Sequence, residues 1–242
     1  MKRFVTILVF CGLLTAAYAQ EAKRPASNFH LGLDLQTKYV WRGMEMLTQD
    51  AAPVLFPGIN YSKGGFYAYV MGGYSVNGSY AEVDMGLCYT YKWITVGVND
   101  YYYPTTASPY DRYFHFGSAD TGHWLEAMVT IAPETIPVYL TVSNFFYGAD
   151  KDLEGKQAYS TYAELGGHYD FLDDHSLALA VGAALNKSCY NGYEHGLGIC
   201  NIELKYTYNV ALKDFALPLS ASYIINPVYG KSFVNFTASF AF

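Results

Sequence analysis

The chain is poor in cysteine and charge, and beyond its first residues it has no long apolar segment. Four of its 242 residues are Cys, and 15% are charged. After position 20 the longest apolar run is 177–185, whereas a membrane helix needs roughly 18 or more such residues. Its 15 Lys and Arg are outnumbered by 21 Asp and Glu, which argues against nucleic-acid or polyanion partners.

Motifs that would hold a cofactor or a metal are also missing. The sequence has no phosphate-binding loop, dinucleotide fingerprint or zinc-binding helix motif, and its cysteines lack metal-ligand spacing. We therefore expect no cofactor and no metal. Cys189 and Cys200 flank an expected loop, where either a disulfide or two small apolar fillers would suit the pattern.

The amino terminus has the pattern of an export signal. Lys2 and Arg3 precede an apolar run from Phe4 to Ala16, and Ala17-Tyr18-Ala19 follows. A charged start, a short apolar core and an A-x-A site predict a signal peptide over residues 1–19. The remaining residues, 20–242, would form one exported domain.

The other end of the chain reads as a strand with two different faces. Its apolar positions alternate with mostly polar ones and end on an aromatic residue: Val234, Phe236, Ala238, Phe240 and Phe242 against Asn235, Thr237, Ser239 and Ala241. This is the period of an extended chain. A closing strand with a terminal Phe looks like that of an outer-membrane barrel, where the barrel assembly machinery would engage Phe242.

Similar alternation recurs along the chain between turn signals. It predicts twelve strands, at 29–42, 54–61, 66–76, 80–91, 94–103, 123–131, 138–147, 159–171, 177–185, 198–210, 215–226 and 231–242. An even number suits a transmembrane up-and-down antiparallel β-barrel, with short turns on one side and long loops on the other. The predicted fold class is all-β, in the cell outer membrane and in contact with its lipid.

Aromatic residues gather at the expected strand ends, with aliphatic residues between them. One girdle would hold Tyr61, Phe66, Tyr89, Tyr91, Trp93, Tyr169, Phe171, Tyr206, Tyr208, Phe215, Phe240 and Phe242, and the other Tyr39, Trp41, Tyr74, Tyr101, Tyr102, Phe146 and Tyr223. Leu31, Leu33, Val83, Val96, Val98, Leu140, Val181, Leu204 and Leu219 lie between them. Two girdles around an apolar band are typical of a barrel in a bilayer.

Three short stretches near the start of the barrel resemble a known family. Tyr39-Val40-Trp41-Arg42-Gly43, the segment from Pro53 to Gly58, and Gly65-Phe66-Tyr67-Ala68 are similar to the opening hairpins of the TorF-like porins. The likeness covers only this first part of the barrel. It implies an outer-membrane barrel and brings no catalytic residues.

Charged side chains on the faces opposite the apolar band are the candidate pore lining. They are Asp34, Lys38, Arg42, Glu82, Asp84, Glu126, Glu164, His168, Asp170, Glu203 and Lys205. Charges deep inside strands cannot face hydrocarbon. They predict either a mildly acidic pore that passes small hydrophilic solutes or ions, or a plug of salt bridges in a closed barrel. The loop 104–121, with Asp111, Arg112, His115 and Asp120, is a candidate constriction or ligand-binding loop.

Two other function classes stay open beside a channel. A closed structural or adhesive barrel would bind a partner through its outer loops, and barrels of either kind could form oligomers. An outer-membrane lipid hydrolase would need a serine, a base and an orienting amide in one place. His123 and Asn144 fall near one another, but no serine lies in phase beside them, so we expect no enzyme activity.

Overall fold

The computed structural model describes residues 28–48, 51–104, 112–213 and 215–242. The predicted signal peptide over 1–19 and the candidate residue Asp111 lie outside these ranges. Among the described residues, no helix is long and apolar enough to cross a membrane.

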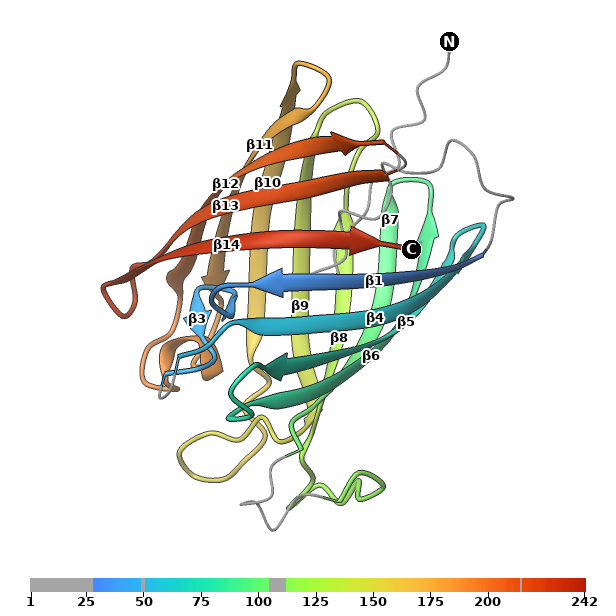
Figure 1. Cartoon of the computed structure of the whole chain (residues 1–242). Helices are drawn as coiled ribbons and strands as arrows, with labels where there is room; N and C mark the ends of the chain where they lie inside the picture. Colours follow the sequence, from blue (N-terminus) through green and yellow to red (C-terminus); the bar gives the residue numbers. More distant parts are fainter. Residues whose placement is uncertain (1–27, 49–50, 105–111, 214) are drawn as a thin grey trace.

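Twelve strands form one closed antiparallel barrel, in which each strand pairs with its neighbours in the chain (Figure 1). They are β1 (Phe29–Gln36), β4 (Val54–Lys63), β5 (Phe66–Ser75), β6 (Ala81–Tyr91), β7 (Ile94–Tyr102), β8 (His123–Ile131), β9 (Val138–Gly148), β10 (Thr161–Phe171), β11 (His175–Ala184), β12 (Gly198–Leu212), β13 (Phe215–Asn226) and β14 (Lys231–Ala241). The predicted transmembrane up-and-down barrel is confirmed.

The last strand closes the barrel against the first. β14 pairs with β1 in the register Asp34↔Ser239 and Gln36↔Thr237. The alternation predicted for this strand is present, since Asn235 and Ser239 are buried while Val234 and Phe236 are exposed. Closure leaves neither strand with an unpaired edge, which is the requirement for backbone in a bilayer.

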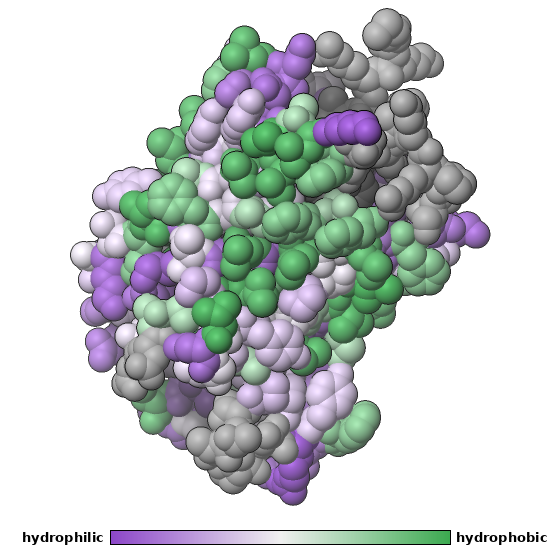
Figure 2. Space-filling view, in the orientation of Figure 1, coloured by the Kyte–Doolittle hydropathy of each residue, from purple (hydrophilic) through white to green (hydrophobic). Residues whose placement is uncertain are grey.

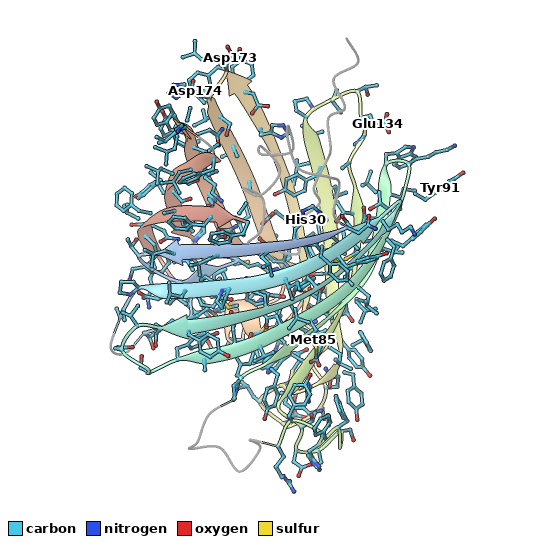
Figure 3. All side chains as sticks on the ribbon, turned by 45° about the vertical axis from the view of Figure 1, so that its right-hand side comes forward. His30, Met85, Tyr91, Glu134, Asp173 and Asp174 are labelled. Carbon is cyan, nitrogen blue, oxygen red and sulfur yellow. The ribbon has the colours of Figure 1, made fainter. Side chains whose placement is uncertain are left out.

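The connections sort into two kinds at opposite ends of the barrel. Short turns follow β4, β6, β8, β10 and β12, and the longest connections follow β1, β7, β9 and β11. Tyr91, Glu134, Asp173 and Asp174 mark the short-turn end in Figure 3. This asymmetry matches the prediction from the sequence.

Apolar side chains gather across the middle of the barrel face drawn in Figure 2. Val96, Val98, Leu140, Leu204 and Leu219 all expose more than a third of their surface. A water-soluble protein would bury such a band, whereas a transmembrane barrel presents it to lipid.

Three members of the predicted outer girdle point inward instead. Tyr39 and Tyr101 are buried, and Trp41 packs against the buried clusters of the interior. Alternation alone cannot separate lipid-facing from interior aromatics, because a barrel whose inside is partly filled also buries apolar rings.

The first strand is shorter than predicted. β1 ends at Gln36 rather than at Arg42, because the side chain of Asn235 accepts hydrogen bonds from the Thr37 hydroxyl and the Lys38 backbone N–H. Beyond this point β2 (Val40–Trp41) pairs with β3 (Met44–Glu45). Arg42 and Gly43, with φ of 49° and 78°, form the turn between them.

Candidate functional site

The β2–β3 hairpin lies inside the barrel near the long-loop end. We call residues 39–47 the inserted hairpin. Trp41 lies beside the ring of Tyr101 on β7, and Tyr39 meets Phe56 on β4 edge-on, with 4.8 Å between ring centres. The Gly43 carbonyl accepts a 2.9 Å hydrogen bond from Asn226 on β13. Contacts with strands around the whole circumference place this hairpin across the lumen.

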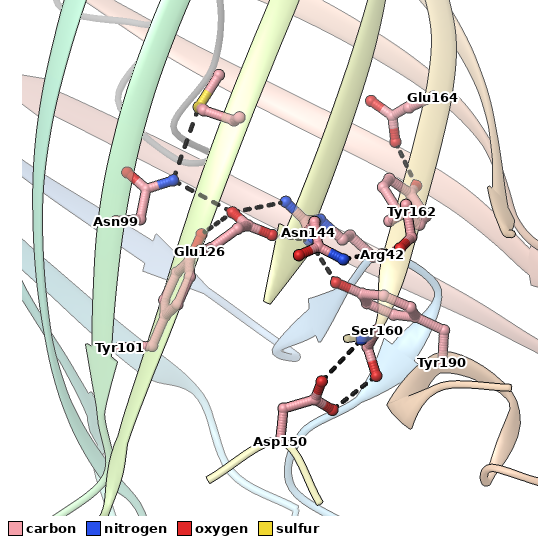
Figure 4. Close-up of polar contacts among 12 residues, drawn as sticks. Arg42, Asn99, Tyr101, Glu126, Asn144, Asp150, Ser160, Tyr162, Glu164 and Tyr190 are labelled. Atoms are coloured by element: carbon pink, nitrogen blue, oxygen red, sulfur yellow. Dashed lines mark hydrogen bonds and ion pairs between the residues drawn. The ribbon is translucent and has the colours of Figure 1, made fainter. Parts of the chain in front are cut away.

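An ion pair holds the tip of the inserted hairpin to the wall. Arg42 Nη1 and Nη2 lie 2.5 and 3.2 Å from the two carboxylate oxygens of Glu126 on β8, whose side chain is fully buried (Figure 4). The guanidinium also donates to the Tyr190 hydroxyl at 2.5 Å and lies over the rings of Trp41 and Tyr162. A bidentate ion pair of this kind fixes the orientation of the guanidinium as well as its distance from the carboxylate.

Glu126 is satisfied by further donors on the wall. The Tyr101 hydroxyl donates to Glu126 Oε2 at 2.9 Å, and Asn99 Nδ2 donates to the same oxygen at 3.2 Å. A buried carboxylate is tolerable when its charge is paired and its lone pairs are occupied. Arg42 and Glu126, both predicted to line the pore, therefore meet directly.

A second ion pair lies within the connection itself. The Lys38 ammonium donates to Glu45, and both side chains are partly buried. Lys38 was predicted on the first strand, but it lies beyond the end of β1. Its charge is thus used to stabilise the inserted hairpin.

Aromatic packing surrounds these polar contacts. One buried cluster joins Tyr39 and Leu47 of the inserted hairpin to Val54, Phe56, Tyr69 and Met71 of the wall. The other joins Trp41 and Met44 to a group that includes Tyr101, Phe145, Tyr162 and Tyr190. Tyr190 and Tyr162 were not recognised in the sequence, where nothing distinguishes them among 25 tyrosines.

Glu82 and Asp84 on β6 face inward and are 0% and 2% exposed. The Tyr80 hydroxyl donates to Glu82 Oε2 at 2.6 Å. Among the residues that the structure describes, Glu82 Oε1 and Asp84 Oδ1 have no hydrogen-bond partner.

The opposite wall of the lumen carries half-buried polar groups. Glu164 on β10 accepts hydrogen bonds from the hydroxyls of Tyr139 and Tyr162 at 2.7 and 2.5 Å. Glu203 on β12 accepts one from Ser222 at 2.7 Å. Lys205 is also half-buried, and Asp34 on β1 is buried beside Ser239.

The remaining predicted strand positions lie at the rim. The His168 and Asp170 side chains are 46% and 70% exposed near the short-turn end of β10, with 3.9 Å between Nε2 and Oδ2. They therefore stand at one mouth of the barrel rather than along its length.

The described part of the 104–121 loop does not enter the lumen. His115 Nε2 lies 2.6 Å from Asp120 Oδ1, and Arg112 is 3.4 Å from the same carboxylate. The hydrogen bond from His115 lowers the pKa of Asp120. Phe116 stacks on His123 with 4.2 Å between ring centres, on the outward face of β8. The role predicted for this loop, a constriction or a ligand-binding loop, stays a prediction.

The geometry around His123 gives a hydrolase little support. His123 Nδ1 lies 2.8 Å from Asp100 Oδ2, and Nε2 lies 2.5 Å from the Tyr113 carbonyl oxygen. Both ring nitrogens are therefore already engaged. Asn144 pairs across the sheet with Ala127, and its amide donates to the Tyr159 carbonyl and the Thr161 hydroxyl, away from His123.

The thiols are free among the described residues. Cys88 and Cys200 are buried, Cys189 is half-buried, and none is in a disulfide. Burial raises the pKa of the Cys189 thiol to about 12, with Asp150 adding to the effect. Cys189 and Cys200 were expected either to form a disulfide or to fill space as small apolar side chains, and the structure shows the second arrangement.

Comparison with known proteins finds likeness in fold and none in family. No protein-family model matches the chain, and no curated protein matches it. A structure from work on the in-meso crystallisation of membrane proteins shares 11% identity and a TM-score of 0.50, over 88% of this chain and 83% of that one. The NanC porin shares 11% identity and a TM-score of 0.48 over 87% and 98%.

An outer membrane channel from Pseudomonas putida F1 is also similar, with 11% identity and a TM-score of 0.42 over 91% of this chain and 97% of that one. At this identity the likeness concerns the fold alone. The resemblance to the TorF-like porins stays a prediction.

Proposed function

We propose that the protein is an outer-membrane channel for the passive diffusion of small hydrophilic solutes or ions. The observation that carries this proposal is the sign of the charges on the inward faces of a transmembrane barrel. The inward carboxylates on the strands are Asp34, Glu82, Asp84, Glu126, Glu164 and Glu203, whereas Lys205 is the inward base on the described strands. An acidic lining favours cations and neutral solutes over anions.

The inserted hairpin would set the width of the passage. It contacts β8 through Arg42, β4 through Tyr39 and β13 through Gly43, so it narrows the lumen from several sides. Glu164, Glu203 and Lys205 are only half-buried, which suits a path along β10 to β12. In this proposal a solute diffuses past these three side chains, and the hairpin excludes large molecules.

Conductance across a planar bilayer tests the proposal. The refolded full chain should give discrete and reproducible current steps. A barrel that is folded by circular dichroism and by its heat-dependent gel mobility, yet stays silent, would contradict it.

A second candidate is a closed structural or adhesive barrel. The paired Arg42 and Glu126 and the aromatic clusters around them favour it, because together they form a plug near the long-loop end. Function would then lie in the outer loops, such as Ser188 to His195, and not in the lumen. The same conductance measurement separates the two, since a plugged barrel carries no current.

A further inference from the structure

Two carboxylates on β6 stand apart from the other charges of the lumen. Glu82 and Asp84 are separated by one residue, so both point to the same inward face. They are 0% and 2% exposed. Glu82 Oε1 and Asp84 Oδ1 find no hydrogen-bond partner in the described part of the chain. The hydrogen-bonding capacity of this buried pair is thus not fully used.

No basic side chain among the described residues forms an ion pair with either group. Lys38 is paired with Glu45, and Arg42 is paired with Glu126. Two neighbouring carboxylates buried without a positive charge are strongly unfavourable. Such a pair requires either bound protons or a bound cation.

The surroundings of the pair are rich in neutral oxygen. The Tyr80 hydroxyl lies 2.6 Å from Glu82 Oε2, and the Tyr39 ring lies 5.7 Å from that of Tyr80. A tyrosine hydroxyl is a neutral oxygen that can donate a hydrogen bond or coordinate a metal.

The wall behind Glu82 is shaped to receive its carboxylate. Gly73 lies directly across the strand pair from Glu82. A Cβ at Gly73 would approach Glu82 Oε1 to 2.6 Å and Cγ to 2.7 Å. The missing side chain lets the carboxylate lie close against β5, which keeps Oε1 on the inner surface of the barrel.

We propose that Glu82 and Asp84 together bind one hard divalent cation of the Ca²⁺ type, with the Tyr80 hydroxyl beside it. Carboxylate and neutral oxygen atoms are the ligands that Ca²⁺ prefers, and its charge cancels that of the pair. Water would complete the coordination. The inference does not require an open pore, because a closed barrel could hold the same ion.

Terbium luminescence tests the site without any transport measurement. Tb³⁺ is a hard-oxygen substitute for Ca²⁺, and nearby Tyr39 and Tyr80 rings can sensitise its emission. The refolded full chain should show saturable tyrosine-sensitised emission that Ca²⁺ displaces. Glu82→Gln and Asp84→Asn should each weaken Tb³⁺ binding by about 10- to 100-fold, the range seen when groups that support a metal site are removed.

Glu164→Gln is the matched control. Glu164 is also an inward carboxylate with tyrosine hydroxyls beside it, so its removal tests whether any such group would serve, and binding should persist. Heat-dependent gel mobility confirms folding of each variant, and the Ca²⁺ competition in the wild-type chain needs no variant at all.

The proposal is overturned if the wild-type chain gives no saturable emission that Ca²⁺ displaces, or if that emission survives both Glu82→Gln and Asp84→Asn. The first result would indicate that the carboxyls carry protons instead of a cation. A chain that conducts but gives no terbium signal would refute the cation site and leave the channel proposal intact. A chain that binds Tb³⁺ but carries no current would refute the channel and leave the cation site intact.

Discussion

The contact between Arg42 and Glu126 joins two residues that are 84 positions apart in the chain. The guanidinium side chain is 15% exposed and the carboxylate 0%. Such a pair contributes little net stability compared with apolar groups of the same shape, but breaking it leaves a buried charge. Its main effect is to fix where the inserted hairpin lies.

Removing the arginine should therefore be costly. We expect Arg42→Ala to lower the free energy of unfolding by about 3 kcal/mol, because Glu126 stays buried without its counter-charge. Denaturant unfolding in detergent measures the loss.

Two comparisons separate charge from packing. The double variant Arg42→Ala with Glu126→Gln should recover part of the lost free energy of unfolding. The control Arg112→Ala removes a pair whose arginine is 59% exposed, and it should change the free energy of unfolding by less than about 1 kcal/mol. Equal losses in the Arg42 and Arg112 variants would contradict this reading.

Cys189 should be chemically inert. Its raised pKa, due mainly to burial, leaves very little thiolate at neutral pH, and the thiolate is the reactive form. A maleimide should modify Cys189 in the unfolded chain at least ten times faster than in the folded barrel. A tenfold difference in the thiolate fraction corresponds to about one pKa unit. Mass spectrometry of timed samples reads this directly, and rapid labelling of folded protein would refute it.

At the scale of elements, the hairpin tip depends on the absence of a side chain at Gly43. Gly43 has a φ of +78°, and a Cβ there would lie 1.9 Å from the Cys200 carbonyl oxygen. Gly78, in an outer turn, has a similar φ of +74°, and a Cβ there would meet no atom of the described residues within 4 Å. The two glycines share the backbone strain that an alanine would bring, but only Gly43 is also in close contact.

Gly43→Ala should thus displace the inserted hairpin. Both Gly43→Ala and Gly78→Ala carry about 1 kcal/mol of left-handed strain, whereas only the first should also raise single-channel conductance. Current steps recorded side by side provide the comparison. Unchanged steps in a folded Gly43→Ala barrel would show that the hairpin does not set the width of the passage.

The sequence predicted most elements because alternation and turn chemistry agree there. β13 begins and ends as expected, at Phe215 and Asn226, where polar turns flank a run of alternating residues. The prediction extended the first strand to Arg42 because Tyr39 and Trp41 continue the same alternation. Only the tertiary contacts of Asn235 show where that strand ends.

The candidate site was predictable in its charges and not in its pairing. Glu82, Asp84 and Glu126 follow from inward phase alone. That Arg42 meets Glu126, and that Tyr190 joins them from a distant loop, depends on how a hairpin folds back into the barrel. Local patterns carry no signal for such an arrangement.

For the whole molecule, the apolar outer band determines in which environment the barrel is stable, because this band has to face lipid and not water. Leu204 lies in the middle of β12 and is 46% exposed, whereas Leu153 lies in an outer loop and is 76% exposed. In lipid the first contacts hydrocarbon and the second contacts water.

An arginine placed at each of these two positions should affect stability very differently. Leu204→Arg should destabilise the barrel in liposomes by about 2–4 kcal/mol, the cost of an arginine near the bilayer middle, and Leu153→Arg should have almost no effect. Guanidinium titration followed by tryptophan fluorescence provides both values. Similar changes at the two positions would mean that the band does not face lipid.

We propose that an acidic lumen, narrowed by the inserted hairpin, passes small cations. The reversal potential of single channels under a KCl gradient tests it most directly. We expect a sign that reports K⁺ preference in the wild-type chain, and a smaller preference after Glu164→Gln with Glu203→Gln, because these half-buried carboxylates line the proposed path. Preference for Cl⁻, or a folded barrel that carries no current, would contradict the claim.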